Sequence, residues 1–179
     1  MAKKLVILLR HGEYDTSPLG TPSLTARGRE QARISAQALK GLSIDAAHCS
    51  TMLRAQETAD VAAEELKLSF TRSKLLIEGM PTRIPSIPST VAQVKADRAR
   101  MDRAFEKFFQ PTKKERTELI VCHGNLIRYL LTRSLALPPS AWARFVSNHC
   151  GITKIYVREH GMRVVSYNET VHLPFGLVT

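Results

Sequence analysis

The chain of 179 residues has few cysteines and no long hydrophobic run. Its three cysteines, Cys49, Cys122 and Cys150, have no Cys-x-x-Cys spacing, which argues against a disulfide framework and against a tetrahedral zinc site. The longest wholly aliphatic run spans residues 5–9, far short of the ~20 residues that a membrane-spanning helix needs. The first residues lack the long apolar region and cleavage site of a signal peptide. We therefore expect a soluble, reduced, cytoplasmic protein that does not associate with a membrane.

Acidic and aromatic residues are also scarce. The 16 acidic side chains are outnumbered by 26 basic ones, and the resulting positive field attracts anionic partners. A nucleic-acid partner would predict a recognised binding motif, or aromatic residues among the basic ones, and neither is visible. Arginine, which contacts phosphate through a planar pair of N–H groups, is more frequent than lysine. We therefore expect a phosphorylated partner and no nucleic acid.

Strand and helix patterns alternate along the chain. Apolar runs at residues 4–9 and 119–122 are typical of strands buried on both faces of a parallel sheet. The other predicted strands lie at residues 45–49, 70–77, 152–157 and 162–167, the last two forming an edge hairpin. Helices are predicted at residues 25–39, 50–66, 90–109 and 123–137. This alternation predicts a three-layer α/β/α sandwich with a mainly parallel sheet and an antiparallel edge strand, in a single domain over residues 1–179.

Turn and cap residues separate these elements. Thr25 is the predicted N-cap of the first helix, and Ser50 or Thr51 that of the second. A turn-rich segment is predicted around Pro18. A proline-containing loop is predicted at residues 79–90, and it leads into a basic segment, residues 83–116, with nine basic and four acidic side chains. We expect this segment to roof a binding site and to favour anionic substrates.

Two histidines follow predicted strands directly. Ligands of open α/β sheets bind beyond the carboxyl ends of the strands, where His11 and His123 are expected. Each precedes a glycine, Gly12 or Gly124, which relieves the steric limits on the backbone at a sharp turn. Arg10 ends a buried strand, where an unpaired guanidinium would cost several kcal/mol. The pattern therefore predicts an anion beside these residues.

Arg54 lies in the first turn of a predicted helix. A cation there opposes the positive end of the helix dipole, at a cost of roughly 0.3–1 kcal/mol. An oxyanion bound between Arg54 and the helix N-terminus would reverse that effect. Together with Arg10, His11 and His123, Arg54 predicts a phosphate pocket.

These residues lie in motifs that resemble a known family. The block Leu8-Leu9-Arg10-His11-Gly12-Glu13 resembles the signature of the histidine phosphatase (phosphoglycerate-mutase-like) superfamily. The resemblance continues through residues 24–32, 50–58, 76–81 and 121–129, and so spans most of the chain. The last two blocks, with residues 148–153, look closest to the mitochondrial serine/threonine protein phosphatase branch.

The resemblance implies a role for each matching residue. His11 would be the nucleophile that forms a phosphohistidine, and Glu78 the proton donor, with Glu13 as the alternative donor. His123 would hold the phosphoryl oxygens together with the expected substrate-binding residues, which are Arg10, Gly12, Arg54 and Gly124. Many members place an asparagine a few residues after the nucleophile, where this chain has Tyr14-Asp15-Thr16-Ser17, so Thr16 or Ser17 is the candidate replacement. No metal ion and no cofactor are implied.

Rival interpretations remain at this point. Cys122 and Arg128 have the Cys-x5-Arg spacing of cysteine-dependent phosphatases. A phosphoglycerate mutase and a non-catalytic scaffold that binds phosphorylated ligands are further alternatives. The expected activity is metal-independent hydrolysis of a phosphomonoester, on phosphoserine or phosphothreonine of a protein or on a small anionic metabolite. A homodimer is possible through the apolar tail at residues 173–178.

Overall fold

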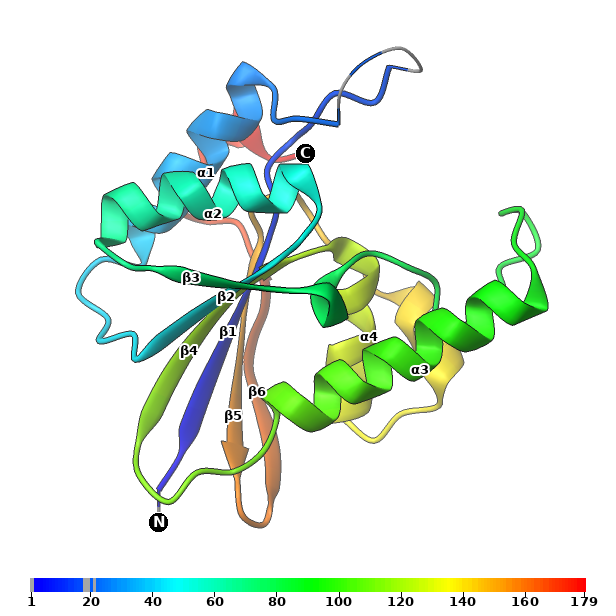
Figure 1. The fold of residues 1–179 in the computed structure, drawn as a ribbon. Coiled ribbons are helices and arrows are strands. Elements are labelled where there is room, and N and C mark those ends of the chain that lie inside the picture. The colour runs from blue at the N-terminus through cyan, green and yellow to red at the C-terminus, as the bar shows by residue number, and fades with distance from the viewer. Residues whose placement is uncertain (1, 18–19, 21) are drawn as a thin grey trace.

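The computed structural model describes residues 2–17, 20 and 22–179, so the turn predicted around Pro18 lies partly outside the described residues. Six strands form one sheet in the order β3-β2-β4-β1-β5-β6 (Figure 1). The strands are β1 (Lys4–Arg10), β2 (Ala46–Ser50), β3 (Phe70–Ser73), β4 (Arg116–Cys122), β5 (Ile152–Arg158) and β6 (Gly161–Glu169). The α-helices are α1 (Ala26–Ala38), α2 (Leu53–Leu66), α3 (Val91–Phe108) and α4 (Gly124–Ser134). The short 3-10 helices are η1 (Lys74–Leu76), η2 (Pro139–Arg144) and η3 (Phe175–Leu177).

The sheet is parallel across β3, β2, β4 and β1 and antiparallel beyond β1. β5 runs against both β1 and β6, so the reversed strand lies one position inside the edge. The predicted three-layer sandwich is confirmed, and the hairpin predicted from residues 152–167 does form the edge of the sheet. The carboxyl ends of β1 and β4 lie side by side because the two strands pair in register from Lys4 with Arg116 to Arg10 with Cys122.

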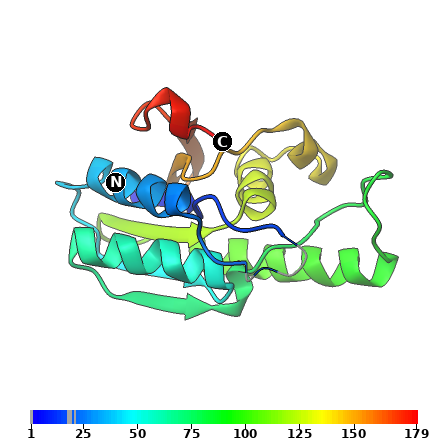
Figure 2. The ribbon, with the colours of Figure 1, turned by 90° about the horizontal axis from the view of Figure 1, so that it is seen from above.

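Alternate residues of β1 serve two separate cores. Ile7 and Leu9 belong to the core under α1 and α2, whereas Val6 and Leu8 belong to the core under α3 and α4. Seen from above, α1 and α2 lie on one side of the sheet and α3 and α4 on the other (Figure 2). Since both faces of β1 are buried, the strand has a continuous apolar run and no polar alternation.

Three predicted boundaries are corrected. The helix predicted from residue 50 begins at Leu53, with Met52 as an N-cap that makes no side-chain hydrogen bond. The strand predicted within residues 70–77 ends at Ser73, and the chain continues as η1. α4 ends at Ser134, three residues early, because Ala136 adopts a left-handed φ of 52° and the chain turns there.

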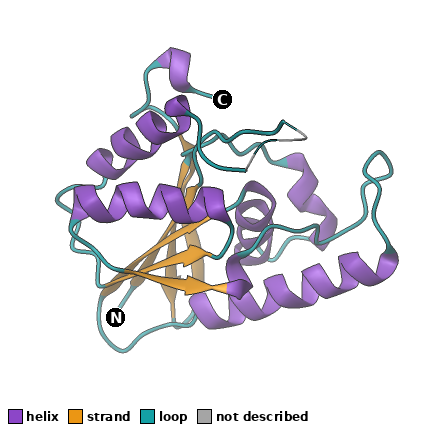
Figure 3. Cartoon of the chain, turned by 45° about the horizontal axis from the view of Figure 1, so that its top comes forward, coloured by secondary structure: helices purple, strands orange, loops and turns teal. Residues whose placement is uncertain are grey.

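Other local predictions hold. Thr25 caps α1 by accepting a hydrogen bond from the Gly28 N–H. Residues 79–90 form a loop that projects beyond the N-terminal end of α3 (Figure 3). Across the described part of the chain, no helix is long and apolar enough to cross a membrane.

Candidate active site

The residues predicted to bind phosphate gather at the carboxyl ends of β1 and β4. Arg10 is the last residue of β1 and His11 follows it, while His123 follows β4 and is the N-cap of α4. Arg54 reaches the same place from the first turn of α2. The His11 and His123 rings lie 5.1 Å apart, and both residues are almost fully buried. The positive ends of two helix dipoles, those of α2 and α4, thus meet at this point.

His11 has one nitrogen available for chemistry. Its Nδ1 lies 2.9 Å from the Gly12 carbonyl oxygen, which can only accept, so Nδ1 carries the proton. Its Nε2 then has a lone pair, and this accepts a hydrogen bond of 3.0 Å from the Arg54 Nε–H. Burial above all, then the charges of neighbouring groups, keeps the pKa of His11 well below its usual value. His11 is therefore a neutral imidazole with Nε2 facing a guanidinium.

The His123 ring faces the His11 ring, and its Nδ1 has no hydrogen-bond partner among the described residues. Its Nε2 lies 2.8 Å from the Ser50 hydroxyl, which also accepts the Met52 N–H. The Ser50 proton is thus free to point at Nε2, and Nδ1, which has no partner among the described residues, can donate into the site. Burial, reinforced by Arg54 and Arg10, lowers the pKa of His123 to about 2. Ser50 therefore holds the His123 ring, which explains why it does not cap α2.

Arg10 is held by neutral acceptors. Its Nη1 donates a hydrogen bond to the Ser147 carbonyl, and its Nη2 donates to His149 Nε2 at 3.0 Å. Its Nε has no partner among the described residues. Burial lowers the pKa of Arg10. A Cβ atom on Gly124 would lie 3.3 Å from Arg10 Nε, so glycine gives the guanidinium room at the start of α4. Arg10 is thus oriented without being neutralised.

His149 is a site residue that we did not predict. Its Nδ1 lies 3.0 Å from Thr179 Oγ1, and its ring centre is 5.5 Å from that of His11. Burial, with Arg10 next, lowers the pKa of His149 to about 4, which keeps Nε2 free to accept from Arg10. It precedes β5, and the antiparallel pairing of β5 with β1 brings it to the end of β1; no local sequence pattern indicated that pairing.

Glu78 lines a pocket of about 370 Å³ together with Arg10 and Gly124. Its Oε1 accepts a hydrogen bond of 3.3 Å from the Gly79 N–H. Burial raises the pKa of the Glu78 carboxyl, opposed by this hydrogen bond and by Arg54 and Arg10. A carboxyl with a raised pKa beside a phosphate pocket has the properties of a general acid.

The alternative donor, Glu13, is engaged elsewhere. Its carboxylate accepts a hydrogen bond from Thr25 Oγ1 at 2.9 Å and forms an ion pair of 3.2 Å with Arg27.

In the stretch that lacks the family asparagine, Thr16 and Ser17 are exposed, whereas the Tyr14 ring lies against His11, with ring centres 5.2 Å apart. Gly12 packs too closely on α1 for any side chain.

Cys122 does not have the properties of a nucleophile. It is fully buried, and burial raises the pKa of its thiol strongly, which opposes formation of a thiolate. The structure therefore argues against the cysteine-dependent rival. In the described ranges, no group of three or more His, Cys, Asp or Glu side chains is arranged to hold a metal ion.

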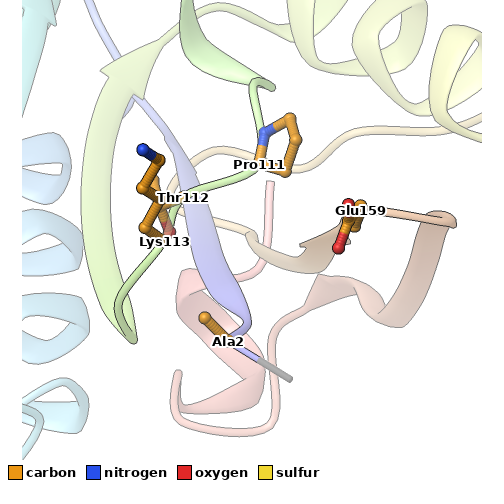
Figure 4. Close-up of a pocket in the computed structure, with 5 residues that line it drawn as sticks. All are labelled: Ala2, Pro111, Thr112, Lys113 and Glu159. Atoms are coloured by element: carbon orange, nitrogen blue, oxygen red, sulfur yellow. The ribbon is translucent and has the colours of Figure 1, made fainter.

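A second pocket, of about 350 Å³, lies far from these residues. It is lined by Ala2, Pro111, Thr112, Lys113 and Glu159 (Figure 4). These residues lie near the start of β1 and β4 and at the turn between β5 and β6, at the opposite end of the sheet. The pocket contains no histidine and is separate from the candidate site.

Comparison with protein families gives a match over most of the chain. The model of the Histidine phosphatase superfamily (branch 1) matches residues 6–83 and 81–170. The Serine/threonine-protein phosphatase Pgam5, mitochondrial, of Drosophila willistoni is 40% identical over 181 residues, covering 90% of this chain and 61% of that protein. The protein of the same name from Caenorhabditis elegans is 35% identical over 188 residues, covering 97% and 65%. The chain thus spans less than two thirds of these relatives.

Solved structures share the fold. Phosphoglycerate mutase from Plasmodium falciparum superposes with a TM-score of 0.70 at 28% identity, covering 98% of this chain and 96% of that one. A putative alpha-ribazole-5'-P phosphatase from Escherichia coli superposes with a TM-score of 0.77 at 23% identity, covering 94% and 97%. At 23% identity, the similarity to the Escherichia coli protein supports a shared fold and nothing more.

The expected cytoplasmic location is wrong, because the curated relatives are named as mitochondrial proteins. The sequence has no long apolar segment, but its composition does not distinguish a cytoplasmic protein from a mitochondrial one.

Proposed function

Since this chain belongs to the histidine phosphatase superfamily, as the family model and the relatives show, we propose that it hydrolyses phosphomonoesters through a phosphohistidine on His11. The curated relatives are named as phosphatases, which supports the predicted enzyme class. The observation that carries the mechanism is the hydrogen bonding of His11: the Gly12 carbonyl holds the proton on Nδ1, so the Nε2 lone pair faces the Arg54 guanidinium.

The first step forms a bond from His11 Nε2 to phosphorus and breaks the ester P–O bond. In the free enzyme the Arg54 Nε–H occupies this lone pair. A bound phosphoryl group, with its negative oxygens, competes for that N–H and frees the nitrogen. Arg10, Arg54 and the His123 Nδ1–H then stabilise the charge on the equatorial oxygens. The departing alkoxide takes the proton of the Glu78 carboxyl.

The second step returns the enzyme to its starting state. Water attacks phosphorus, the N–P bond breaks, and the Glu78 carboxylate left by the first step takes a proton from that water. His11 regains its lone pair and inorganic phosphate leaves. No step in this sequence needs a metal ion, since guanidinium and imidazole N–H groups supply the stabilisation.

The substrate we propose is phosphoserine or phosphothreonine in a protein. Relatives that cover nearly the whole chain are named serine/threonine-protein phosphatases, and their names also lead us to propose a mitochondrial location. We further propose that residues 1–179 act as one domain, because the segments that carry the site residues all adjoin one six-stranded sheet.

The test compares hydrolysis of p-nitrophenyl phosphate by the wild type and by His11→Ala. We expect at least a thousandfold loss, since the nucleophile is removed. His160→Ala is the matched control, because His160 is exposed at the turn between β5 and β6, far from the site, and should retain full activity. Equal rates for His11→Ala and the wild type would refute the proposal.

A phosphoglycerate mutase is the second candidate, favoured by the 28% identity to the Plasmodium falciparum enzyme. The two activities differ in the fate of the phosphoryl group. A phosphatase releases inorganic phosphate from 3-phosphoglycerate or leaves it untouched, whereas a mutase isomerises it without release. Isomerisation alone would replace hydrolysis as the proposed activity.

A further inference from the structure

Three arginines differ from all the others in the described residues. Six of the sixteen arginines form ion pairs with carboxylates, and seven others are exposed to solvent. The three that are neither exposed nor paired with a carboxylate are Arg10, Arg54 and Arg128. All three lie at the candidate site. A guanidinium removed from water without a carboxylate is costly, so each of the three indicates an external anion.

Arg128 is held in place by neutral groups. Its Nη1 donates to the Phe145 carbonyl at 3.1 Å and its Nη2 donates to Asn125 Oδ1. Its Cζ lies 4.7 Å from the centre of the Trp142 ring, and its Nε is buried without a partner among the described residues. These contacts fix the orientation of the guanidinium but leave its charge uncompensated, and one N–H on each Nη remains free.

Arg128 lines the same pocket as Arg10 and Glu78. One wall of this pocket is formed by Ala143, Phe145, Val146 and Ser147, and Arg144 is not part of it. Val146 is 70% exposed, so this wall borders solvent. A ligand that places its phosphoryl group at His11 would therefore have its neighbouring atoms beside Arg128.

Counting charges points to the kind of group that binds there. The two negative charges of a phosphoryl dianion are matched by Arg10 and Arg54, while Glu78 enters the reaction protonated and adds none. One positive charge, that of Arg128, remains. A single carboxylate balances it, whereas a second phosphate dianion would leave an excess negative charge in a half-buried pocket.

We propose that Arg128 binds the carboxylate of an acidic side chain next to the phosphorylated residue, so that the enzyme selects phosphosites with an acidic neighbour. This inference rests on the proposed phosphatase function. It gives Arg128 a role in specificity, separate from the role of Arg10 and Arg54 in binding the transferred phosphoryl group.

The experiment uses phosphoserine peptides that differ only in a Glu or a Gln at one position, from two residues before to two residues after the phosphoserine. Gln has nearly the same shape as Glu without the charge. For the wild type we expect kcat/KM to be about tenfold higher for Glu than for Gln at one or more positions, the size of one charge-assisted contact. In Arg128→Met, whose stem can still pack on Trp142, we expect this ratio to fall to about one.

Arg144→Met is the matched control, because Arg144 is exposed on η2 close in sequence to the pocket wall, and the ratio should survive there. Arg128→Met also removes two hydrogen bonds and lowers rates with both peptides, but the ratio cancels this structural loss. Arg128→Lys keeps the charge without the planar fork, and we expect an intermediate ratio.

Two outcomes would overturn the inference: no preference for Glu at any position in the wild type, or the same ratio in Arg128→Met as in the wild type. If Arg128→Met does not fold by circular dichroism, Arg128→Lys decides, and an unchanged ratio there counts against it. Failure of the proposed function itself is distinguishable, because it appears as hydrolysis of p-nitrophenyl phosphate that does not depend on His11.

Discussion

Arg100 shows how a single side chain positions the proposed general acid. Its guanidinium donates to three carbonyl groups of the segment before and at Glu78, those of Leu75, Ile77 and Glu78, at 3.3, 2.7 and 3.0 Å. It also pairs with Asp97 at 2.9 Å. We expected the basic segment, residues 83–116, to cover the site, but Arg100 has a different role. Its guanidinium faces the backbone that carries Glu78 and holds that backbone in position.

We predict that Arg100→Met lowers activity mainly where proton donation matters. The loss leaves three partly buried carbonyls without a donor, each worth about 1–3 kcal/mol, and frees the Glu78 segment to shift. Hydrolysis of an alkyl phosphate should fall at least tenfold in kcat. Hydrolysis of p-nitrophenyl phosphate, whose leaving group needs little protonation, should fall much less.

The control is Arg103→Met, since Arg103 is exposed on the same helix and should leave both rates unchanged. If Arg100→Met instead raised KM for both substrates at constant kcat, the result would support the expectation that the basic segment 83–116 covers the site and binds anionic substrates.

Most of the site could be predicted because each residue is adjacent in sequence to a recognisable element. Arg10, His11 and His123 follow apolar runs, and Arg54 lies in the first turn of a helix. His149 could not be placed in this way, since its position depends on β5 pairing antiparallel with β1. No local pattern encodes such a pairing between distant segments.

At the scale of elements, α1 is joined to the loop after β1 by a close backbone approach. A Cβ atom on Gly28 would lie 1.9 Å from the Glu13 carbonyl oxygen, and one on Gly12 would lie 2.4 Å from the Gly28 carbonyl oxygen. Two glycines thus let α1 pack directly on the segment that follows His11. The motifs at residues 8–13 and 24–32 are recognisable in the sequence. That the two motifs contact each other is seen only in the structure.

We predict that Gly28→Ala destabilises the protein although alanine is the better helix former. The gain in helix propensity is about 1 kcal/mol. The clash is with backbone atoms, which cannot rotate away, so α1 must shift at a cost that exceeds ordinary overpacking of roughly 1–3 kcal/mol. We expect thermal unfolding to occur several degrees lower, at ~2–4 °C per kcal/mol of net loss.

Gly176→Ala is the comparison, because a Cβ atom there meets no atom within 4 Å. A Gly28→Ala protein with an unchanged or raised melting temperature would show that α1 and the loop are not in tight contact.

Element types were easier to predict than their ends. The continuous apolar runs of β1 and β4 follow from burial on both faces, a property of the strand itself. The ends of α2 and α4 depend on single contacts made after folding, such as Ser50 with His123. Periodicity contains no information about those contacts.

At the scale of the whole molecule, most histidines are held neutral. Burial lowers the pKa values of five of the six, which are His11, His48, His123, His149 and His172. The chain already has a formal charge of +10 near neutral pH. Unfolding in mild acid therefore adds further protons to a molecule that is already strongly positive.

We predict that the free energy of unfolding falls as the pH is lowered below ~6.5. Between that pH and the lowered native pKa, a histidine binds a proton in the unfolded chain and not in the native one, so acid favours unfolding by up to ~1.4 kcal/mol per pH unit for each such group. The pKa of His123 is lowered to about 2, so its whole effect lies in this window. Glu78, whose pKa is raised by burial, acts in the opposite direction and is common to all the proteins compared. Urea unfolding of His123→Gln should therefore lose roughly 2 kcal/mol less than the wild type between about pH 7 and about pH 5. His160→Gln, altered at an exposed histidine, should follow the wild type; equal losses in all three proteins would mean that His123 is not buried in its neutral form.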